Sequence, residues 1–446
     1  QTIYTPAVHP REPYISSREK YVSPFYEREK ELGGFFDNEA ACWERALAYK
    51  SNEQKLAKYL KEGPLREDEW DHRHVPYEIA NAEHLAMSDS VGMINLSHFP
   101  IMDIKGPDAE RMLEYLSVAK VGSNTPEGKV IYTNFLDEDG GVHADLTISR
   151  LGSDSYRIVT GGADGNRDWV LLRNYRDDNG LNADINIRTH DIATLGLWGP
   201  EAQKALGNFI DPNEINIENF PFVSAKNLTL NLSGGKKIDV WAARISYVGE
   251  SGWEIYLNND SEDGLALYDS LLEVGVVPVG IETYANSRRL EKSFRLQGAD
   301  LETEYNAIEA AIQRPLVKEA DFHGKAAHLS HREEDPCAVL CTMTLDNLNV
   351  SGKTRYPVGI SPIVDPVTGE VPIDSKGRRS YTTGMSYCPS IKKFVVMGYL
   401  PKEIALKGKS LLIEYFNEDG DGLYPMTVQI VGKGSLYDPT NERVRA

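Results

Sequence analysis

The chain has 446 residues, of which 41% are hydrophobic, so it can bury a sizeable core divided among about two to four domains. Its formal net charge of −19 excludes a broadly basic surface for nucleic acid and favours cationic small molecules such as protonated or quaternary amines. The sequence contains no signal-peptide pattern and no long apolar run, so we expect a cytoplasmic protein without a membrane span.

The predicted elements divide the chain into three parts. Residues 1–37 are rich in Pro, Tyr, Arg and Glu without a lasting period, which predicts an extended arm lying across another surface. Residues 38–63 have apolar positions three and four apart and a final glycine, which predicts a helix. Strands and helices then alternate, so we expect two α+β lobes within 38–330. Short β-rich runs with turn signals predict a carboxy-terminal β domain over 331–446.

One sequence pattern occurs twice in the α+β part. The segments DIKGPDAERMLEYL (103–116) and GLWGPEAQKALGNF (196–209) share a strand, Gly-Pro and an amphipathic helix. Pro107 and Pro200 suit the first helical position. The repeat indicates either two related lobes or a common strand-to-helix turn used twice.

Several common catalytic and cofactor motifs are absent from the sequence. The glycines of IVTGGADGNRDW have the wrong spacing for a dinucleotide-binding GxGxxG, and Walker A, HExxH and GxSxG patterns do not occur. The histidines and cysteines form no convincing metal-ligand pair, so we expect no metal site.

The segment GKVIYTNFLDEDGGVHADLTISRL (128–151) predicts two strands around the turn DEDGG. Val142 and Ala144 alternate with His143 and Asp145, which places Asp145 on the polar face. The pattern alone favours a solvated aspartate. The alternative is a carboxylate aimed into a cavity, where it accepts a proton or stabilises a cationic centre.

The segment RISYVGESGWEIYL predicts that strands 240–247 and 253–257 pair, with Tyr247 and Glu254 at the same end. A buried carboxylate needs hydrogen-bond donors. A planar ligand with adjacent N–H groups, such as the 2-amino-4-oxo edge of a pterin, provides them in a bidentate pair. The neighbouring Arg244 is an equally good partner, and the sequence leaves both open.

A basic stripe follows on a predicted helix over 282–298, which ends at Gly298. Arg288, Lys292 and Arg295 are spaced to share one face. A polyanionic tail fits such a stripe, although a solvated face balanced by acidic neighbours is the more common interpretation.

Together these segments resemble the aminomethyltransferase family, which includes the T-protein of the glycine cleavage system. The resemblance is greatest to the folate-binding half of dimethylglycine and sarcosine dehydrogenases, and it runs from residue 36 to 440. Beyond the segments above it includes NAEHLAMSDSVGMINLSHFPIMDIKGPDA, VKEADFHGKAAHL and YTTGMSYCPSIKKFVVMGYL.

The resemblance implies an α+β fold: a three-domain cloverleaf ring whose cavity holds tetrahydrofolate, with a β-barrel-like carboxy-terminal domain. It implies that Glu254 binds the pterin edge and that Tyr247 packs on the folate. Asp145 matches the family's catalytic aspartate, with Tyr132 in the same pocket and Arg289 nearby. This match reverses the preference for a solvated Asp145.

The implied function is a tetrahydrofolate-dependent one-carbon transferase or demethylase. It moves a methyl or methylene group from a small methylated amine or onium donor to tetrahydrofolate, while Asp145 acts as a base or stabilises a developing cation. The alternative is a folate-binding, formaldehyde-capturing module or subunit of a larger dehydrogenase-like oxidoreductase, served by a flavoprotein partner or a flavin domain. A third hypothesis, a structural relative that has lost folate, conflicts with the presence of Asp145, Tyr247 and Glu254 together.

Overall fold

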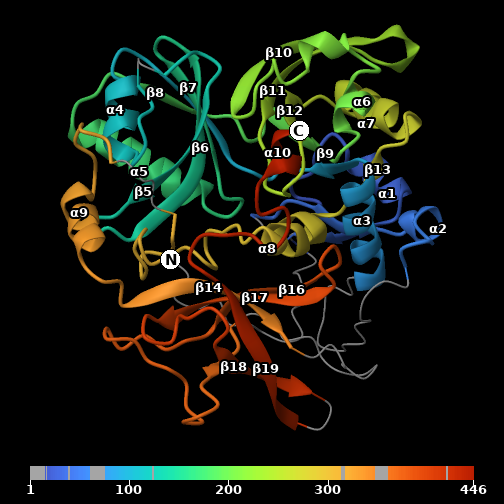
Figure 1. Ribbon diagram of the computed structural model, residues 1–446. Helices are drawn as coiled ribbons and strands as arrows, with labels where there is room; N and C mark the ends of the chain where they lie inside the picture. The colour runs from blue at the N-terminus through green and yellow to red at the C-terminus, as the bar shows by residue number, and fades with distance from the viewer. Residues whose placement is uncertain are drawn as a thin grey trace.

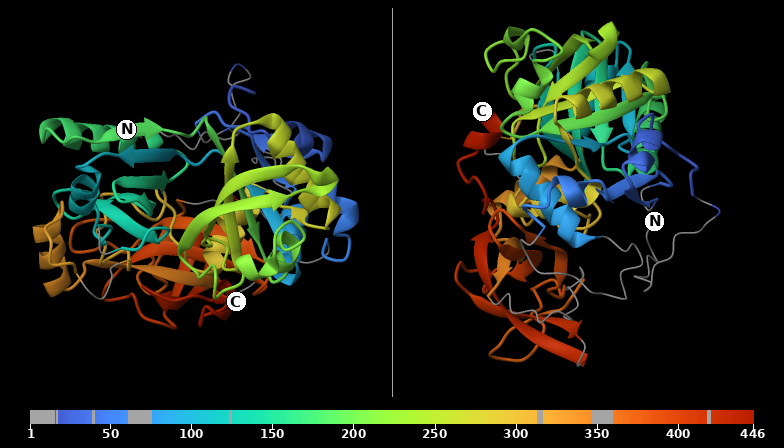
Figure 2. Two further views of the ribbon diagram at one scale, coloured as in Figure 1. Left: turned by 90° about the horizontal axis from the view of Figure 1, so that it is seen from above. Right: turned by 90° about the vertical axis from the view of Figure 1, so that its right-hand side faces the viewer.

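The computed structural model has three lobes that meet near the centre of the molecule (Figure 1). It describes residues 16, 18–38, 41–60, 76–122, 125–312, 317–346, 360–417 and 420–446. Each lobe is built around one five- or six-stranded β-sheet, and a further two-stranded sheet lies near the amino terminus. The third lobe lies below the other two in the right view of Figure 2. Within the described ranges, no helix has the length and apolar character needed to cross a membrane.

The first lobe, on the right of Figure 1, is a sheet with helices on both faces, and its main core lies between one face and two of these helices. Trp253, Ile255 and Leu257 point into this core, which leaves Glu254 and Tyr256 on the opposite face. The strand order is β10 (Ser224–Asn231), β11 (Lys237–Arg244), β12 (Gly252–Asn258), β9 (Ile192–Trp198), β3 (Gly92–Asn95) and β13 (Val277–Pro278). The helices of this lobe are α3 (Tyr77–Asp89), α6 (Ala202–Leu206) and α7 (Ser261–Glu273).

The amino-terminal region differs from both predictions made for it. Within the expected extended arm, α1 (Tyr26–Glu31) is helical and β1 (Gly34–Asp37) is a strand, while residues 1–15 lie outside the described part. The predicted helix over 38–63 is wrong: β2 (Arg45–Tyr49) pairs antiparallel with β1, and of residues 41–60, which the structure describes, only α2 (Asn52–Lys55) is an α-helix. The run Ala-Leu-Ala-Tyr that ends β2 is buried on consecutive positions, which suits a strand covered on both faces rather than a one-sided helix.

The second lobe, on the left of Figure 1, carries the hairpin predicted around the turn DEDGG. Its strand order is β5 (Val130–Leu136), β6 (Val142–Gly152), β7 (Ser155–Thr160), β4 (Ile101–Lys105) and β8 (Asp184–Ile187). Helices α4 (Ala109–Leu116) and α5 (Gly165–Asp178) cover the apolar face. The repeated sequence pattern forms the same turn in both lobes, because Gly106 after β4 and Gly199 after β9 have φ values of +144° and +138°.

The third lobe is a curled sheet preceded by α9 (Lys325–Glu333), as expected for a β-rich carboxy-terminal region (Figure 1). Its strand order is β15 (Ile363–Val364), β18 (Ser410–Asn417), β19 (Gly420–Val431), β14 (Ala338–Leu345), β17 (Lys393–Pro401) and β16 (Thr382–Cys388). The chain then returns to the first lobe and ends in α10 (Glu442–Arg445), as the right view of Figure 2 shows.

The predicted helix over 282–298 is shorter than expected. It consists of a π-helical turn, Thr283–Arg288, followed by α8 (Arg289–Glu291). The chain leaves the helix at Ser293, where φ is +54°, a left-handed conformation that a continuing helix cannot contain. A π-helical turn widens the backbone and is frequent at functional sites.

Candidate active site

Asp145 lies on the polar face of the β5–β6 ladder, as the alternation predicts. Asn134 is its cross-strand partner and donates a hydrogen bond from Nδ2 to Asp145 Oδ1 at 3.0 Å. The Tyr132 hydroxyl also donates to this carboxylate. Val142 and Ala144 are fully buried on the other face, which fixes the orientation of Asp145.

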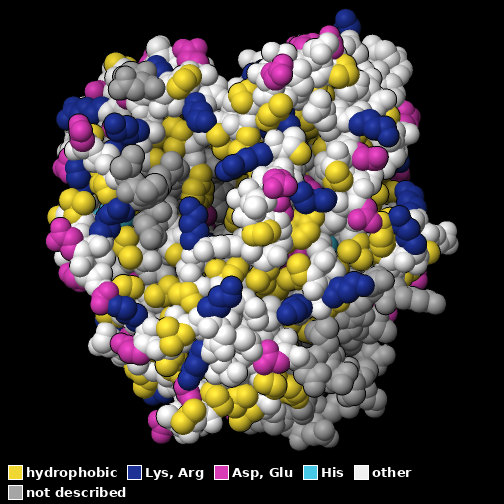
Figure 3. Space-filling model, viewed as in Figure 1, with side chains coloured by type: hydrophobic (Ala, Val, Ile, Leu, Met, Phe, Trp, Pro, Cys, Tyr) yellow, Lys and Arg dark blue, Asp and Glu magenta, His cyan; other side chains and the backbone are white. Residues whose placement is uncertain are grey.

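The surroundings of Asp145 suit a general base. Burial raises the pKa of Asp145 to about 7, although the hydrogen bonds from Tyr132 and Asn134 and the positive charge of Arg295 oppose the rise. Tyr132 keeps 42% of its surface accessible, so the group beside Asp145 can be reached from solvent. Figure 3 shows the surface hollowed between the two upper lobes. A carboxylate with a pKa near neutrality is well matched to accepting a proton at physiological pH.

Glu254 is a buried carboxylate in the first lobe, opposite Ala243 in β11 and Gly196 in β9. It is 9% exposed, and burial raises its pKa to about 7. One hydrogen bond, donated by the Tyr256 hydroxyl to Oε2, opposes this rise. Among the described residues, no other side chain or N–H group donates to it.

Arg244 does not bind Glu254, so the protein-only partner considered from the sequence is wrong. Its Nη1 donates instead to the carbonyls of Ile215 and Phe220, at 3.3 and 2.9 Å. Glu254 therefore keeps acceptor capacity that the described protein atoms leave unused, as expected of a group that binds a ligand with N–H donors.

Tyr247 lies in the loop between β11 and β12 rather than at the end of a strand, because β11 stops at Arg244. Its ring packs against Tyr284 and Phe294, with centroid distances of 5.1 and 5.8 Å. Its hydroxyl donates to the carbonyl of Arg295 at 2.6 Å. Burial raises the pKa of Tyr247 above its usual range, so the phenol stays neutral.

Arg289 is held by the protein itself. It is 1% exposed, and its guanidinium pairs with Asp300 and donates to the carbonyls of Ala285 and Phe294, at 2.9 and 3.2 Å. Gly384 makes room for it, since a Cβ at that position would lie 2.5 Å from Nη2. This environment favours a structural role beside the site, and ligand binding by Arg289 stays a prediction.

The basic stripe is not the solvated face favoured from sequence. Arg288 and Lys292 are 0% and 1% exposed. Arg295 donates to the carbonyls of Ser293, Ala310 and Gly432, at 2.6, 3.0 and 3.0 Å. Two of the three cations are therefore unavailable to a polyanionic tail.

The predicted residues converge on one region. Asp145 and Arg289 are close enough to Tyr247 for their charges to shift the pKa of its hydroxyl in opposite directions. Glu254 and Tyr247 both raise the pKa of the Tyr284 hydroxyl, so Tyr284 lies near both. A groove of about 830 Å³ lies farther out between the first and second lobes, lined by Arg157 and Trp241 among others. It contains none of the five predicted site residues and touches the region only through Tyr256.

Four residues of this region were not among the predicted site residues: Asn134, Tyr256, Tyr284 and Arg295. Tyr256 follows Glu254 by two positions, so strand alternation alone places it on the same face. Asn134 required the register of the β5–β6 pair, and Tyr284 required the π-helical turn. No local signal separated Arg295 from the rest of the stripe.

The chain is similar to several known proteins. Residues 25–319 match the family model described as the GCVT N-terminal domain. The mitochondrial dimethylglycine dehydrogenase of Rattus norvegicus is 30% identical over 82% of this chain, and that of Homo sapiens is 29% identical over 83%. The chain spans 40% of the length of each.

Relatives of similar length are also found. An aminomethyltransferase of Symbiobacterium thermophilum is 28% identical, with coverage of 76% of this chain and 88% of the relative. The crystal structure of glycine cleavage system aminomethyltransferase T from Bartonella henselae superposes with a TM-score of 0.70 at 21% identity, over 92% of this chain and 96% of that one. The expected α+β fold of the aminomethyltransferase type is confirmed.

Proposed function

Because the chain belongs to the GCVT aminomethyltransferase family, we propose that it transfers a methyl or methylene group from a small methylated amine or onium compound to tetrahydrofolate. Aminomethyltransferases are folate-dependent one-carbon transferases and bind tetrahydrofolate. The same proposal includes the class of donor and a cytoplasmic location. It also includes a division of the chain into an arm (1–37), paired lobes (38–330) and a β domain (331–446).

The observation that carries this proposal is two carboxylates without ion-pair partners, Glu254, which is buried, and Asp145, which is half-buried on the polar face of its strand. Among the described residues, neither Asp145 nor Glu254 forms an ion pair, and both have pKa values raised to about 7. Unpaired buried carboxylates are costly to a fold and are retained where a ligand or a reaction uses them. Glu254, with one donor from the protein, fits the adjacent N–H groups of a pterin edge.

The proposed roles follow from the positions of the side chains. Glu254 accepts the pterin N–H donors, and the Tyr247 ring packs on the folate. Asp145 takes a proton from the folate nitrogen or stabilises the developing cation, while Asn134 and Tyr132 orient its carboxylate. Tetrahydrofolate supplies the nitrogen nucleophile that accepts the carbon, and the protein supplies position and proton transfer.

An isotope-transfer assay with Asp145→Asn tests the proposed reaction. Carbon-13-labelled methylated amines, sulfonium compounds and formaldehyde are incubated with the chain and tetrahydrofolate, and labelled folate is measured by mass spectrometry. Asp145→Asn keeps the shape but cannot accept a proton, so turnover should fall by about 10²- to 10⁴-fold while tetrahydrofolate still binds. Full activity in this variant would remove Asp145 from the mechanism.

A second candidate function is supported by the length comparison. Since the chain spans 40% of each dimethylglycine dehydrogenase, it also suits a folate-binding module that captures carbon released by a flavin-containing partner or domain. This candidate predicts labelled folate from formaldehyde but none from methylated amines unless a flavoprotein is added. Turnover of a methylated amine by this chain alone excludes it.

A further inference from the structure

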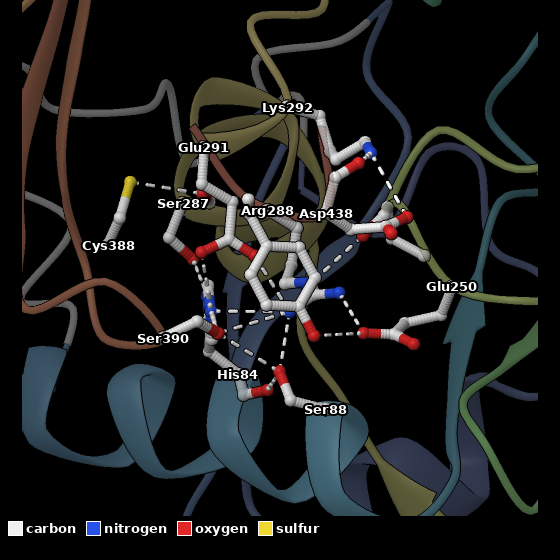
Figure 4. A network of polar contacts seen from close by, with 12 residues as sticks. His84, Ser88, Glu250, Ser287, Arg288, Glu291, Lys292, Cys388, Ser390 and Asp438 are labelled. Carbon is white, nitrogen blue, oxygen red and sulfur yellow. Dashed lines mark hydrogen bonds and ion pairs between the residues drawn. The ribbon is translucent and has the colours of Figure 1, made fainter. Parts of the chain in front are cut away.

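The loop over residues 245–251, which carries Tyr247, is bound through Val248 and Glu250 to a buried polar network (Figure 4). The carboxylate of Glu250, in this loop, is the acceptor at the centre of its contacts. It receives hydrogen bonds from Arg288 Nη2 at 2.5 Å, from the Tyr437 hydroxyl at 2.9 Å and from Arg443 Nε at 2.9 Å. Glu250 and Arg288 are 1% and 0% exposed.

The two residues before Glu250 are held by the same helical segment. Arg288 Nε donates to the carbonyl of Val248 at 2.9 Å. Gly249 has a φ of +77°, and the stem of Lys292 packs so closely that a Cβ at Gly249 would lie 2.7 Å from the Lys292 Cδ atom. Three consecutive loop residues are therefore held by side chains on one short stretch of the chain.

The network also joins the first and third lobes. Arg288 Nη1 donates to Ser88 in α3 of the first lobe at 2.5 Å and to Ser390, between β16 and β17 of the third lobe, at 3.3 Å. Lys292 Nζ donates to the carbonyl of Asp438 at 2.8 Å. Figure 4 shows these side chains converging on Arg288. The position of the loop thus depends on the segment over 435–446 that follows the third lobe.

The charges within this network cannot be removed singly without cost. A buried ion pair contributes little net stability, but the loss of one partner leaves the other charge buried and unpaired. If Glu250 is neutralised, Arg288 keeps Glu291 as its ionic partner at 2.8 Å. The loop, however, loses the negative charge that holds it to Arg288 and Arg443, and it becomes free to move toward solvent. Tyr247 moves with the loop, since it is three residues away on the same short connection.

We propose that Glu250 is a positioning residue for tetrahydrofolate: it fixes the loop so that Tyr247 is presented to the folate. The inference rests on the proposed function, because it assigns Tyr247 to the folate pocket. Glu250 itself faces Arg288, Tyr437 and Arg443 rather than the ligand, so its effect on binding passes through Tyr247.

The test compares the affinity of the full chain for tetrahydrofolate in matched variants. Glu250→Gln keeps the size of the side chain and removes its charge, and we expect the tetrahydrofolate Kd to rise at least tenfold. Glu44→Gln is the control: Glu44 is 2% exposed and accepts from Arg18 at 2.8 and 2.7 Å, without a described contact to the loop. It should lower the thermal unfolding temperature similarly but change Kd by less than twofold.

A double-mutant cycle separates positioning from general destabilisation. Tyr247→Ala should weaken binding by itself, and Glu250→Gln added to it should weaken binding by less than a further twofold, since no tyrosine remains to be positioned. If the two effects multiply, Glu250 does not act through Tyr247 and the proposal is wrong. An equal loss of affinity in Glu44→Gln would also overturn it.

A milder variant keeps the test decisive if Glu250→Gln does not fold. Arg443 has a side chain 38% exposed, and Arg443→Lys retains the charge while removing the Nε donor. For Arg443→Lys we expect the tetrahydrofolate Kd to rise about threefold. The proposal is refuted if Arg443→Lys binds tetrahydrofolate as the wild type does and any folded Glu250→Gln does so too. Failure of the wild-type chain to bind tetrahydrofolate would instead remove the proposed function itself.

Discussion

Replacing Glu254 by glutamine should have opposite effects on stability and on folate affinity. Burial raises the pKa of Glu254 from 4.5 to about 7, so the folded state holds the proton more tightly than the unfolded chain. Its contribution to stability is therefore full below pH 4.5 and is lost as pH rises through 7. At 1.36 kcal/mol per pH unit, the loss is about 3 kcal/mol at pH 8. Glu254→Gln avoids this cost, and we expect it to stabilise the ligand-free protein at pH 8 by about 1–3 kcal/mol.

The same variant should bind tetrahydrofolate more weakly. Loss of a charge-assisted hydrogen-bonded pair costs about 1.5–3 kcal/mol, or about 10- to 150-fold in Kd. Urea unfolding at pH 5 and pH 8, followed by calorimetric titration, measures both effects. The gain in stability should be larger at pH 8 than at pH 5. If Glu254→Gln unfolds more easily at pH 8 and binds tetrahydrofolate as the wild type does, Glu254 is an ordinary structural glutamate.

Three further predictions follow from particular residues. Glu83 is buried with a pKa raised to about 8, so the free energy of unfolding should fall as pH rises from 6.5 to 8.5 in urea titrations, and a flat profile would contradict this pKa. Asn134→Leu removes a donor to Asp145, which should move the pH of half-maximal turnover upward, whereas a downward or absent shift would show that Asn134 does not act on Asp145. Gly249→Ala should cost about 1–3 kcal/mol and weaken folate binding, while Gly234→Ala, with a similar φ of +75° and open space, should cost stability alone.

Much of the fold could be predicted where local pattern and tertiary environment agree. The hairpin over β5 and β6 combines strict alternation with a polar five-residue turn, and both strands form with Asp145 on the expected face. The Gly-Pro turns before α4 and α6 also form, because their backbone conformations at Gly106 and Gly199 strongly restrict the residue type.

The failures occur where distant segments override local preference. Residues 45–49 have helical spacing, but they become a strand because β1 offers pairing partners. The spacing of the basic stripe predicts a solvated face, yet Arg288 is buried because Glu250 and Glu291 pair with it. Glu250 is 38 positions earlier in the chain, so no periodicity within the helix could reveal that contact.

In the candidate site, too, local pattern predicted some features, and contacts with distant segments determined the others. Strand alternation placed Asp145 and Glu254 on their faces, but it could not distinguish a solvated carboxylate from one facing a cavity. That distinction depends on desolvation and on neighbours from other strands, such as Asn134 and Tyr256. For Glu254, the nearby Arg244 was an equally good partner until its carbonyl contacts became visible.

The most direct test of the central claim is a calorimetric titration of the wild-type chain with tetrahydrofolate at pH 8 and at pH 6. The account predicts one site per chain, with weaker binding at pH 6, because protonation of Glu254 through its pKa of about 7 removes the acceptor for the pterin N–H groups. Absence of binding at both pH values would contradict the folate pocket and the transfer reaction derived from it.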